Sequence, residues 1–413
     1  MSEMTRRRME PRLCRPRLAA LATGIAGALA LAPAAGAQTI PVGAPIPVTG
    51  PYSSDGQVME KGLRLALEEL NKKGGLLGKQ LELHVFDIGD LTPDKLQAAA
   101  ASLVEKEKVA VLINGYGGMG PDIPAFCPYP LPYIHNDATS NVVELRDSMG
   151  CSNIFMGADV DVNYGRITFE QLMSVGHAFP SKKLAIIHGP YDWELNSTKG
   201  AAEKAEELGW QVVLNEEVPY ETTQWSGIIS KLRDADPALI YMELLDPAAV
   251  STFADQFRQN PARNALLYLG YTVSVPAFGE IVRQGKADGI FGMTLSAQRP
   301  DERGRAFEEA WRAKYGEDPP FSIAAQIYDE VMLWAAAVTK VGSVDDYAAI
   351  QQAIRETPYE GITGRLVFND QQYVPSKDDT VPTHLLQVQD GKIRQVVIGS
   401  EKVADAVPSS WAP

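Results

Sequence analysis

Residues that could carry out chemistry are sparse in this chain of 413 residues. Asp87 and Asp90 follow an apolar run and could act as paired carboxylates, but helix-cap and loop residues have the same pattern. No Gly-x-Ser-x-Gly sequence places a nucleophilic serine on a strand-to-helix turn. The five histidines have neither the i, i+4 spacing nor the Cys-x-x-Cys neighbours typical of metal ligands. The sequence therefore predicts a protein that is not an enzyme and binds no metal.

A glycine pattern, Gly115-x-Gly117-x-x-Gly120, matches the dinucleotide-binding fingerprint. It follows a predicted strand, and Asp137 lies at about the right distance downstream to contact a ribose. Four prolines between 121 and 130 disfavour the helix that this motif requires, and the glycines follow the third predicted strand rather than the first. We therefore predict no cofactor.

The first 37 residues have the three parts of a secretory signal peptide. Six arginines precede an apolar run from Leu18 to Leu31, and Ala35-Gly36-Ala37 is a typical cleavage sequence. Loss of this segment changes the net charge from −14 to −18, because it holds six arginines and two glutamates. So acidic a protein is a poor partner for nucleic acid or anionic membranes. We expect cleavage near Ala37 and a mature protein outside the cytoplasm.

Two cysteines, Cys127 and Cys151, remain after cleavage, because Cys14 precedes the apolar run. In an oxidising compartment they are expected to form a disulfide, the alternative being two unpaired buried thiols. A loop of this length would stabilise the fold by about 3 kcal/mol.

One strand–helix–strand unit opens the mature chain. Val42–Val48 is the predicted strand, and Thr49 to Gly56 is a loop of small and hydroxyl residues. A predicted helix follows, and the glycine-rich run Asn71 to Lys79 ends it before a second strand, Leu81–Ile88. The apolar positions of the helix are Met59, Leu63, Ala66, Leu67 and Leu70.

The same alternation continues along the chain and predicts an α/β fold with doubly wound, Rossmann-like parallel sheets. The chain is too long for one core, so two lobes are expected. Further predicted strands are 109–113, 132–135, 153–156, 184–188, 212–217, 238–242 and 266–269, with a hairpin at 383–389 and 392–398. Predicted helices are 93–107, 163–175, 194–208, 225–233, 248–259, 301–315, 323–341 and 344–356.

Three crossings between the lobes are predicted, because the late helices need a sheet to cover. They lie near Gly157–Val160, Phe291–Ser296 and Thr363–Asn369. After the signal peptide (1–37), the first lobe comprises 38–158 and 295–364, and the second comprises 159–294 and 365–413.

Several segments resemble the type I periplasmic solute-binding proteins of the leucine/isoleucine/valine-binding kind. They are Thr49-Gly-Pro51, the run Asn71-Lys-Lys-Gly-Gly-Leu-Leu-Gly-Lys79 before a strand, and Ala185-Ile-Ile-His188 before a helix. The resemblance covers nearly all of residues 40–400. It implies a periplasmic protein whose two lobes are joined by three hinge strands and hold a ligand in the cleft between them. The implied partners are a small-molecule ligand and an ABC permease with its ATPase; we expect a monomer.

The same resemblance suggests polar binding residues. Ala138 and Thr139 lie on the fourth-strand turn that binds the ligand carboxylate in the family. Gly117 and Gly118 lie on the third-strand turn, where relatives often carry consecutive serines, and their backbone amides could hold an anion. Asp159 lies where the branched-chain binders place the carboxylate that meets the ligand ammonium. Its alternative role is to cap the following helix or to order the hinge.

Aromatic residues gather at the predicted strand ends. Trp193 aligns with a cleft aromatic of the family, and Tyr52, Tyr116 and Tyr271 fall on strand-to-helix loops, where ligands bind in open α/β sheets. Together they would favour a flat apolar group by stacking, although each could equally be a packing residue. In the second lobe, Glu243 and Thr272 lie on equivalent loops and could supply polar contacts to the ligand.

The main hypothesis is a binding protein that captures an amino acid or related small carboxylate between its lobes and presents it to an ABC importer. The missing serines and additional aromatics leave an aromatic acid, an amide or a urea-type ligand as the alternative. A sensory module of a membrane receptor could use the same clamp, and an exported enzyme on this fold would instead show turnover.

Overall fold

Two β-sheets organise the protein, which a computed structural model describes for residues 39–409 and 411. The predicted signal peptide and its cleavage site lie outside these residues. The first sheet has the order β2-β1-β3-β4-β5, and all its strand pairs are parallel. Its three short strands, β3 to β5, are fully buried, as expected for a parallel sheet covered on both faces. The strands are β1 (Ile40–Ile46), β2 (Leu81–Asp87), β3 (Leu112–Asn114), β4 (Tyr133–His135) and β5 (Ile154–Met156).

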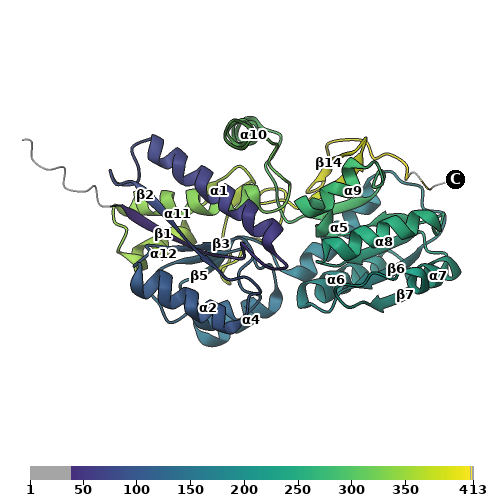
Figure 1. Ribbon diagram of the computed structural model, residues 1–413, viewed down its shortest axis with the longest axis horizontal. Coiled ribbons are helices and arrows are strands. Elements are labelled where there is room, and N and C mark those ends of the chain that lie inside the picture. Colours follow the sequence, from purple (N-terminus) through teal and green to yellow (C-terminus); the bar gives the residue numbers. More distant parts are fainter. Residues whose placement is uncertain (1–38, 410, 412–413) are drawn as a thin grey trace, which may run out of the picture. The chain divides into compact units, whose positions relative to one another are not determined.

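Helices cover both faces of the first sheet. Figure 1 shows α1 and α11 on one face and α2 and α4 on the other. Met59, Leu63 and Leu67 lie on the buried stripe of α1, as their i, i+4 spacing predicts. The helices of this lobe are α1 (Ser53–Lys72), α2 (Pro93–Ala99) with the π-helical Ala100–Lys106, α3 (Asp122–Phe126), α4 (Ser140–Met149), α10 (Glu302–Tyr315), α11 (Ala324–Val341) and α12 (Tyr347–Glu356).

The second sheet has the order β15-β14-β13-β10-β9-β8-β6-β7. Its strands β6 to β10 pair in parallel, and β13 runs antiparallel to β10. α5 and α6 share one hydrophobic core, while α7, α8 and α9 share another. The strands are β6 (Lys183–His188), β7 (Gln211–Glu217), β8 (Leu239–Glu243), β9 (Leu266–Tyr268), β10 (Phe291–Thr294), β13 (His384–Gln389), β14 (Lys392–Ile398) and β15 (Glu401–Lys402). The helices are α5 (Asp161–Ser174), α6 (Asp192–Glu207), α7 (Ser226–Ala235), α8 (Pro247–Gln259) and α9 (Gly279–Arg283), with 3-10 turns at Tyr271–Ser274 and Pro276–Phe278.

Contacts of the segment after Phe368 favour a third change of lobe later in the chain than the predicted one. Phe368 and Val374 pack in the core of α1 and α11, and Met156 of β5 pairs with Tyr373. β13, which begins at His384, already belongs to the second sheet. A small two-stranded sheet, β11 (Tyr359–Glu360) with β12 (Arg365–Leu366), precedes this change. We therefore propose that the chain crosses between 374 and 384 rather than at Thr363–Asn369, and the other lobe boundaries stay predictions.

The structure differs locally from the prediction where segments predicted as loops are helical. α1 begins at Ser53, so Ser53 to Gly56 is the first helical turn rather than a loop. Gly56 permits this start because a Cβ there would overlap the backbone of Pro47. α4, which was not predicted, follows the turn after β4 and ends at Gly150 in the left-handed conformation.

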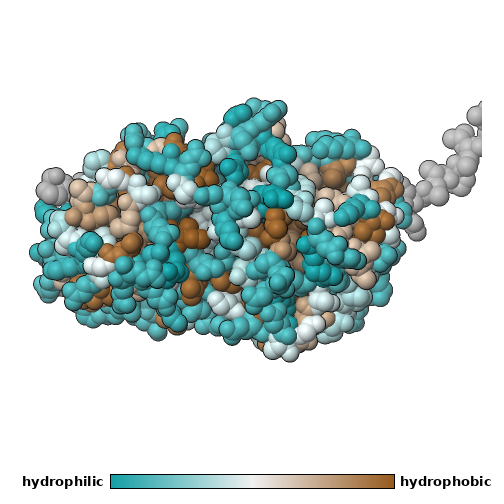
Figure 2. Space-filling view, turned by 180° about the vertical axis from the view of Figure 1, so that it is seen from behind, coloured by the Kyte–Doolittle hydropathy of each residue, from teal (hydrophilic) through white to brown (hydrophobic). Residues whose placement is uncertain are grey.

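The structure contains the disulfide between Cys127 and Cys151, whose Cα atoms are 5.3 Å apart. Among the residues that the structure describes, no helix is both long and apolar enough to cross a membrane. The face in Figure 2 is mostly hydrophilic, with hydrophobic residues in separate small patches, in keeping with the acidic composition of the chain.

Candidate functional site

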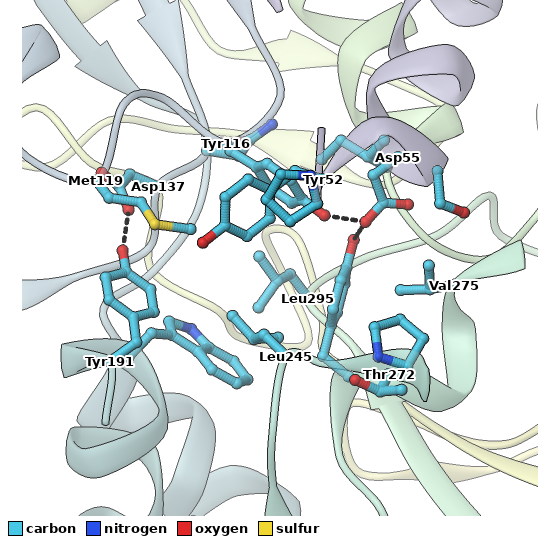
Figure 3. Close-up of a pocket in the computed structure, with 17 residues that line it drawn as sticks. Tyr52, Asp55, Tyr116, Met119, Asp137, Tyr191, Leu245, Thr272, Val275 and Leu295 are labelled. Carbon is cyan, nitrogen blue, oxygen red and sulfur yellow. Dashed lines mark hydrogen bonds between the residues drawn. The ribbon is translucent and has the colours of Figure 1, made fainter. Parts of the chain in front are cut away.

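A cavity lies where loops at the carboxyl ends of the two sheets meet (Figure 3). Both sheets belong to one compact unit. The cavity encloses about 60 Å³. This arrangement therefore favours a small solute. The lining residues are Pro51, Tyr52, Ser54, Asp55, Tyr116, Met119, Asn136, Asp137, Tyr191, Trp193, Leu245, Pro247, Tyr271, Thr272, Val275, Leu295 and Ile323.

Asp55, in the first turn of α1, is the most enclosed acid of the cavity, with 1% of its surface exposed. Its Oδ2 accepts hydrogen bonds from the Tyr116 hydroxyl and, at 3.2 Å, from the Tyr271 hydroxyl. Burial raises the pKa of Asp55, and these hydroxyl donors counteract part of the rise. Oδ1 is buried and has no protein hydrogen-bond partner among the described residues. One carboxylate thus links both lobes at the cavity wall, and within the described residues its Oδ1 lacks a well-directed hydrogen bond although the Ser322 hydroxyl lies near.

Asp137 follows β4 and lines the cavity from the side opposite Asp55 (Figure 3). Its Oδ1 accepts a hydrogen bond of 3.1 Å from the Tyr191 hydroxyl, while Oδ2 is buried without a partner in the described part of the chain. Burial, followed by the negative charge of Asp122, raises the pKa of Asp137 well above its usual range. The carboxyl group is therefore stabilised by a proton or by a cationic neighbour.

Asp122, His135 and Asp137 form a buried cluster whose potential ligand atoms lie within 4.8 Å of one another. The sequence pattern gave no indication of it. Asp122 already accepts hydrogen bonds from the Tyr133 hydroxyl at 2.8 Å and from the Gly120 amide at 3.1 Å. Nδ1 of His135 accepts from the Asp137 amide at 3.2 Å, and burial lowers the pKa of His135 to about 4. All three groups thus accept hydrogen bonds within the protein, which does not fit a metal site well.

The glycine turn after β3 packs against this acidic cluster rather than lining the cavity. A Cβ at Gly118 would lie 2.6 Å from that of Asp122. Gly117, with φ +81°, lies against Asp122 and His135. Because carboxylates surround these glycines, their predicted role as an anion cradle gains no support. Of this turn, only Tyr116 and Met119 line the cavity.

The other predicted polar residues lie behind the cavity wall. Ala138 and Thr139 are buried and do not line it. Asp159 accepts hydrogen bonds from the amides of Val160 and Ser376, both at 2.7 Å, and from the Asn163 side chain at 2.8 Å. Burial raises the pKa of Asp159. These contacts favour its alternative role, which is to order the crossing segment.

Five of the predicted residues come together around the cavity: Tyr52, Tyr116, Trp193, Tyr271 and Thr272. The four aromatic rings form two edge-to-face pairs instead of stacking. The ring centroids are 6.3 Å apart for Tyr52 and Tyr116 and 6.4 Å apart for Trp193 and Tyr271. Glu243 lies behind Tyr271 and accepts from the Tyr268 hydroxyl at 2.7 Å and from the Tyr271 amide at 3.4 Å. It supports the wall without lining it.

Sequence reasoning missed Asp55 as a cavity residue and treated Asp137 only as part of a dinucleotide motif. An acid in the first turn of a helix normally stabilises the helix N-terminus, so its presence there does not indicate that the side chain is buried. Its spacing from Tyr52 was the available signal, because residues three apart share one helix face.

We expect the melting temperature of the ligand-free protein to fall as pH rises from about 6.5 to 8. Burial raises the pKa of Glu243 to about 8 and that of Glu194 to about 7, whereas an unfolded glutamate titrates near 4.3. A carboxyl group whose pKa is higher in the folded than in the unfolded protein stabilises the fold fully below its unfolded-state pKa. This stabilisation is lost as pH rises through its folded-state pKa. The loss should be on the order of 1–2 kcal/mol.

Buried His135 and His384, with pKa values lowered to about 4 and about 3, act in the opposite direction, but only below the unfolded histidine pKa of about 6.5. Thermal melts at several pH values would measure the slope. Glu243→Gln should flatten it, and the exposed control Glu317→Gln should not. An equal slope in the Glu243→Gln variant would contradict this assignment.

Comparisons with known proteins agree with the fold and the cavity. Residues 39–392 match the family described as periplasmic binding protein. The leucine-, isoleucine-, valine-, threonine- and alanine-binding protein of Pseudomonas aeruginosa is 24% identical over 84% of this chain and 90% of its own length. The Leu/Ile/Val-binding protein homolog 7 of Brucella melitensis is 23% identical over 90% of this chain and 94% of its own.

Solved structures have the same fold. The substrate-binding protein LivJ of Streptococcus pneumoniae, in complex with isoleucine, has a TM-score of 0.76 and 21% identity, covering 88% of this chain and 100% of that one. A solute-binding protein of R. palustris in complex with benzoate has a TM-score of 0.73 and 18% identity, covering 91% of this chain and 99% of that one.

The chain belongs to the periplasmic binding protein family, and its fold is that of the type I, leucine/isoleucine/valine-binding members. This family and fold are those of solute-binding proteins and imply an extracytoplasmic location.

Proposed function

We propose that this protein captures a small organic solute bearing a nitrogen donor, such as an amino acid or an amide, and delivers it to an ABC importer. The observation that carries this proposal is Asp55, a buried carboxylate of the cavity wall whose Oδ2 accepts from tyrosines of both lobes and whose Oδ1 has no well-directed hydrogen bond in the described part of the chain. An ammonium or amide N–H would satisfy that oxygen in a charge-assisted hydrogen bond. Closure of the lobes around the solute would shape the surface that the permease and its ATPase recognise.

An aromatic acid is the less suitable ligand for this cavity. Its described lining residues include two acids, Asp55 and Asp137, and no lysine, arginine or histidine. A solute whose only charge is a carboxylate would meet like charges without a counterion. We further propose that the signal peptide is removed near Ala37 and that the mature protein acts as a monomer in the periplasm.

Titration calorimetry of the mature protein would test the function. The panel comprises branched-chain and small amino acids, short amines and amides, urea and benzoate. Saturable binding of a nitrogen-bearing compound, released chemically unchanged, is the expected result. Exclusive binding of benzoate, turnover of the ligand, or no binding across the panel would contradict the proposal.

A further inference from the structure

Two carboxyl groups line the cavity among the described residues. Asp55 and Asp137 contribute them, and no basic side chain lines the wall. The nearest polar neighbours of both acids are tyrosine hydroxyls, namely Tyr116 and Tyr271 at Asp55 and Tyr191 at Asp137. Hydroxyl groups donate hydrogen bonds to a carboxylate but leave its charge uncompensated. When ionised, these carboxyl groups therefore have no counter-charge among the described residues of the cavity.

In each of the two acids, only one carboxylate oxygen accepts a well-directed hydrogen bond from the described protein. One oxygen of each accepts from tyrosine, while Oδ1 of Asp55 and Oδ2 of Asp137 are buried without a well-directed hydrogen bond in the described chain. The Ser322 hydroxyl lies near Asp55, and the Met119 amide lies near Asp137. The residues are only 1% and 7% exposed, so water cannot solvate these oxygens freely. A buried acceptor without a donor costs roughly 1–3 kcal/mol, and more when it is charged. A ligand that donates to both oxygens would remove both costs.

The two acids approach the cavity from opposite sides (Figure 3). Between them the wall includes apolar or aromatic side chains, among them Trp193, Leu245 and Leu295. Such a wall suits a short hydrocarbon chain, because it gains by burial of CH₂ groups and offers them no polar partner. A carboxylate at either end of that chain would face an acid.

We propose that the solute is a short carbon chain with a nitrogen donor at each end, an amine at Asp55 and an amine or amide at Asp137, and without a free carboxylate. This inference rests on the proposed solute-binding function and narrows its ligand class. It assigns the two acids as the residues that distinguish such a compound from an amino acid of equal length.

Matched pairs of ligands test this inference by titration calorimetry of the full mature protein. The amino amides 3-aminopropanamide and 4-aminobutanamide are compared with 3-aminopropanoate and 4-aminobutanoate, and the diamines of three and four carbons are added. At least one amide or diamine should bind about tenfold or more tightly than the amino acid of equal length. Tighter binding of the amino acids would overturn the inference while leaving the proposed function intact. Failure of every compound in this set and in the wider panel would contradict both.

Isosteric variants separate recognition from folding. Asp55→Asn and Asp137→Asn should each weaken binding of the preferred compound by about tenfold or more, because each removes a charge that a ligand nitrogen would meet. The ligand-free variants should melt at an equal or higher temperature, since an unpaired buried acid is lost. The control Asp90→Asn, on an exposed loop, should change neither property. Unchanged affinity in either cavity variant, or a lower melting temperature with unchanged ligand preference, would overturn the inference.

Discussion

Replacing Cys127 and Cys151 by serine is expected to lower the free energy of unfolding by about 3 kcal/mol. The disulfide closes a segment with a sequence separation of 24. The unfolded chain gains conformational freedom when that closure is lost. Chemical denaturation of the oxidised protein and of the double variant would measure the difference.

The same segment contains β4, α4 and the turn that carries Asn136 and Asp137. The double variant should therefore bind ligand more weakly as well, because the Asp137 side of the cavity loses a covalent restraint. A reducing agent should shift the wild-type unfolding midpoint and leave that of the double variant unchanged. Equal stability of the two proteins under oxidising conditions would refute the expected contribution.

Gly165→Ala in α5 should lower the free energy of unfolding by at least about 2 kcal/mol. A Cβ at Gly165 would overlap the Ser197 carbonyl oxygen of α6, and a Cβ at Gly200 of α6 would overlap that of Val162. The two helices thus approach each other through facing glycines, with backbone directly against backbone. An alanine methyl group must push them apart, and this cost exceeds the gain in helix propensity of roughly 1 kcal/mol.

The matched control is Gly227→Ala in α7, where a Cβ meets no atom within 4 Å. That change should raise stability slightly, by up to about 1 kcal/mol. Since α6 carries Trp193 at its first turn, Gly165→Ala should also weaken ligand binding. Urea unfolding of both variants gives the comparison, and similar effects in the two would show that the helix contact is not tight.

Much of the fold could be predicted because its signals are local. The spacing of Met59, Leu63 and Leu67 defines the buried stripe of α1, and the glycines after Asn71 end that helix. Short apolar runs between helices indicate parallel strands, whatever the order in which they pair. The positions at which the chain crosses between the lobes depend on contacts between segments that are distant in sequence. The later position that we propose for the third crossing rests on Tyr373, which pairs beside Met156, more than two hundred residues away in sequence.

Cavity residues could be predicted only where they lie just after the end of a strand. Tyr52, Tyr116, Trp193, Tyr271 and Thr272 reach the cavity because the ends of parallel strands lie at one edge of a sheet. For Asp159 the family resemblance suggested contact with the ligand, with helix capping or ordering of the hinge as the alternative. Its carboxylate accepts from the amides of Val160 and Ser376, which favours the alternative.

By itself, the sequence determined an α/β chain of two lobes, the cysteine pair and the loops that form a cleft, because periodicity and spacing encode these. Only the tertiary structure decided which acids face that cleft. Burial and hydrogen-bond satisfaction depend on partners from distant segments, as Tyr116 and Tyr271 show at Asp55. The same carboxyl group would be an ordinary helix-start residue if those two tyrosines lay elsewhere.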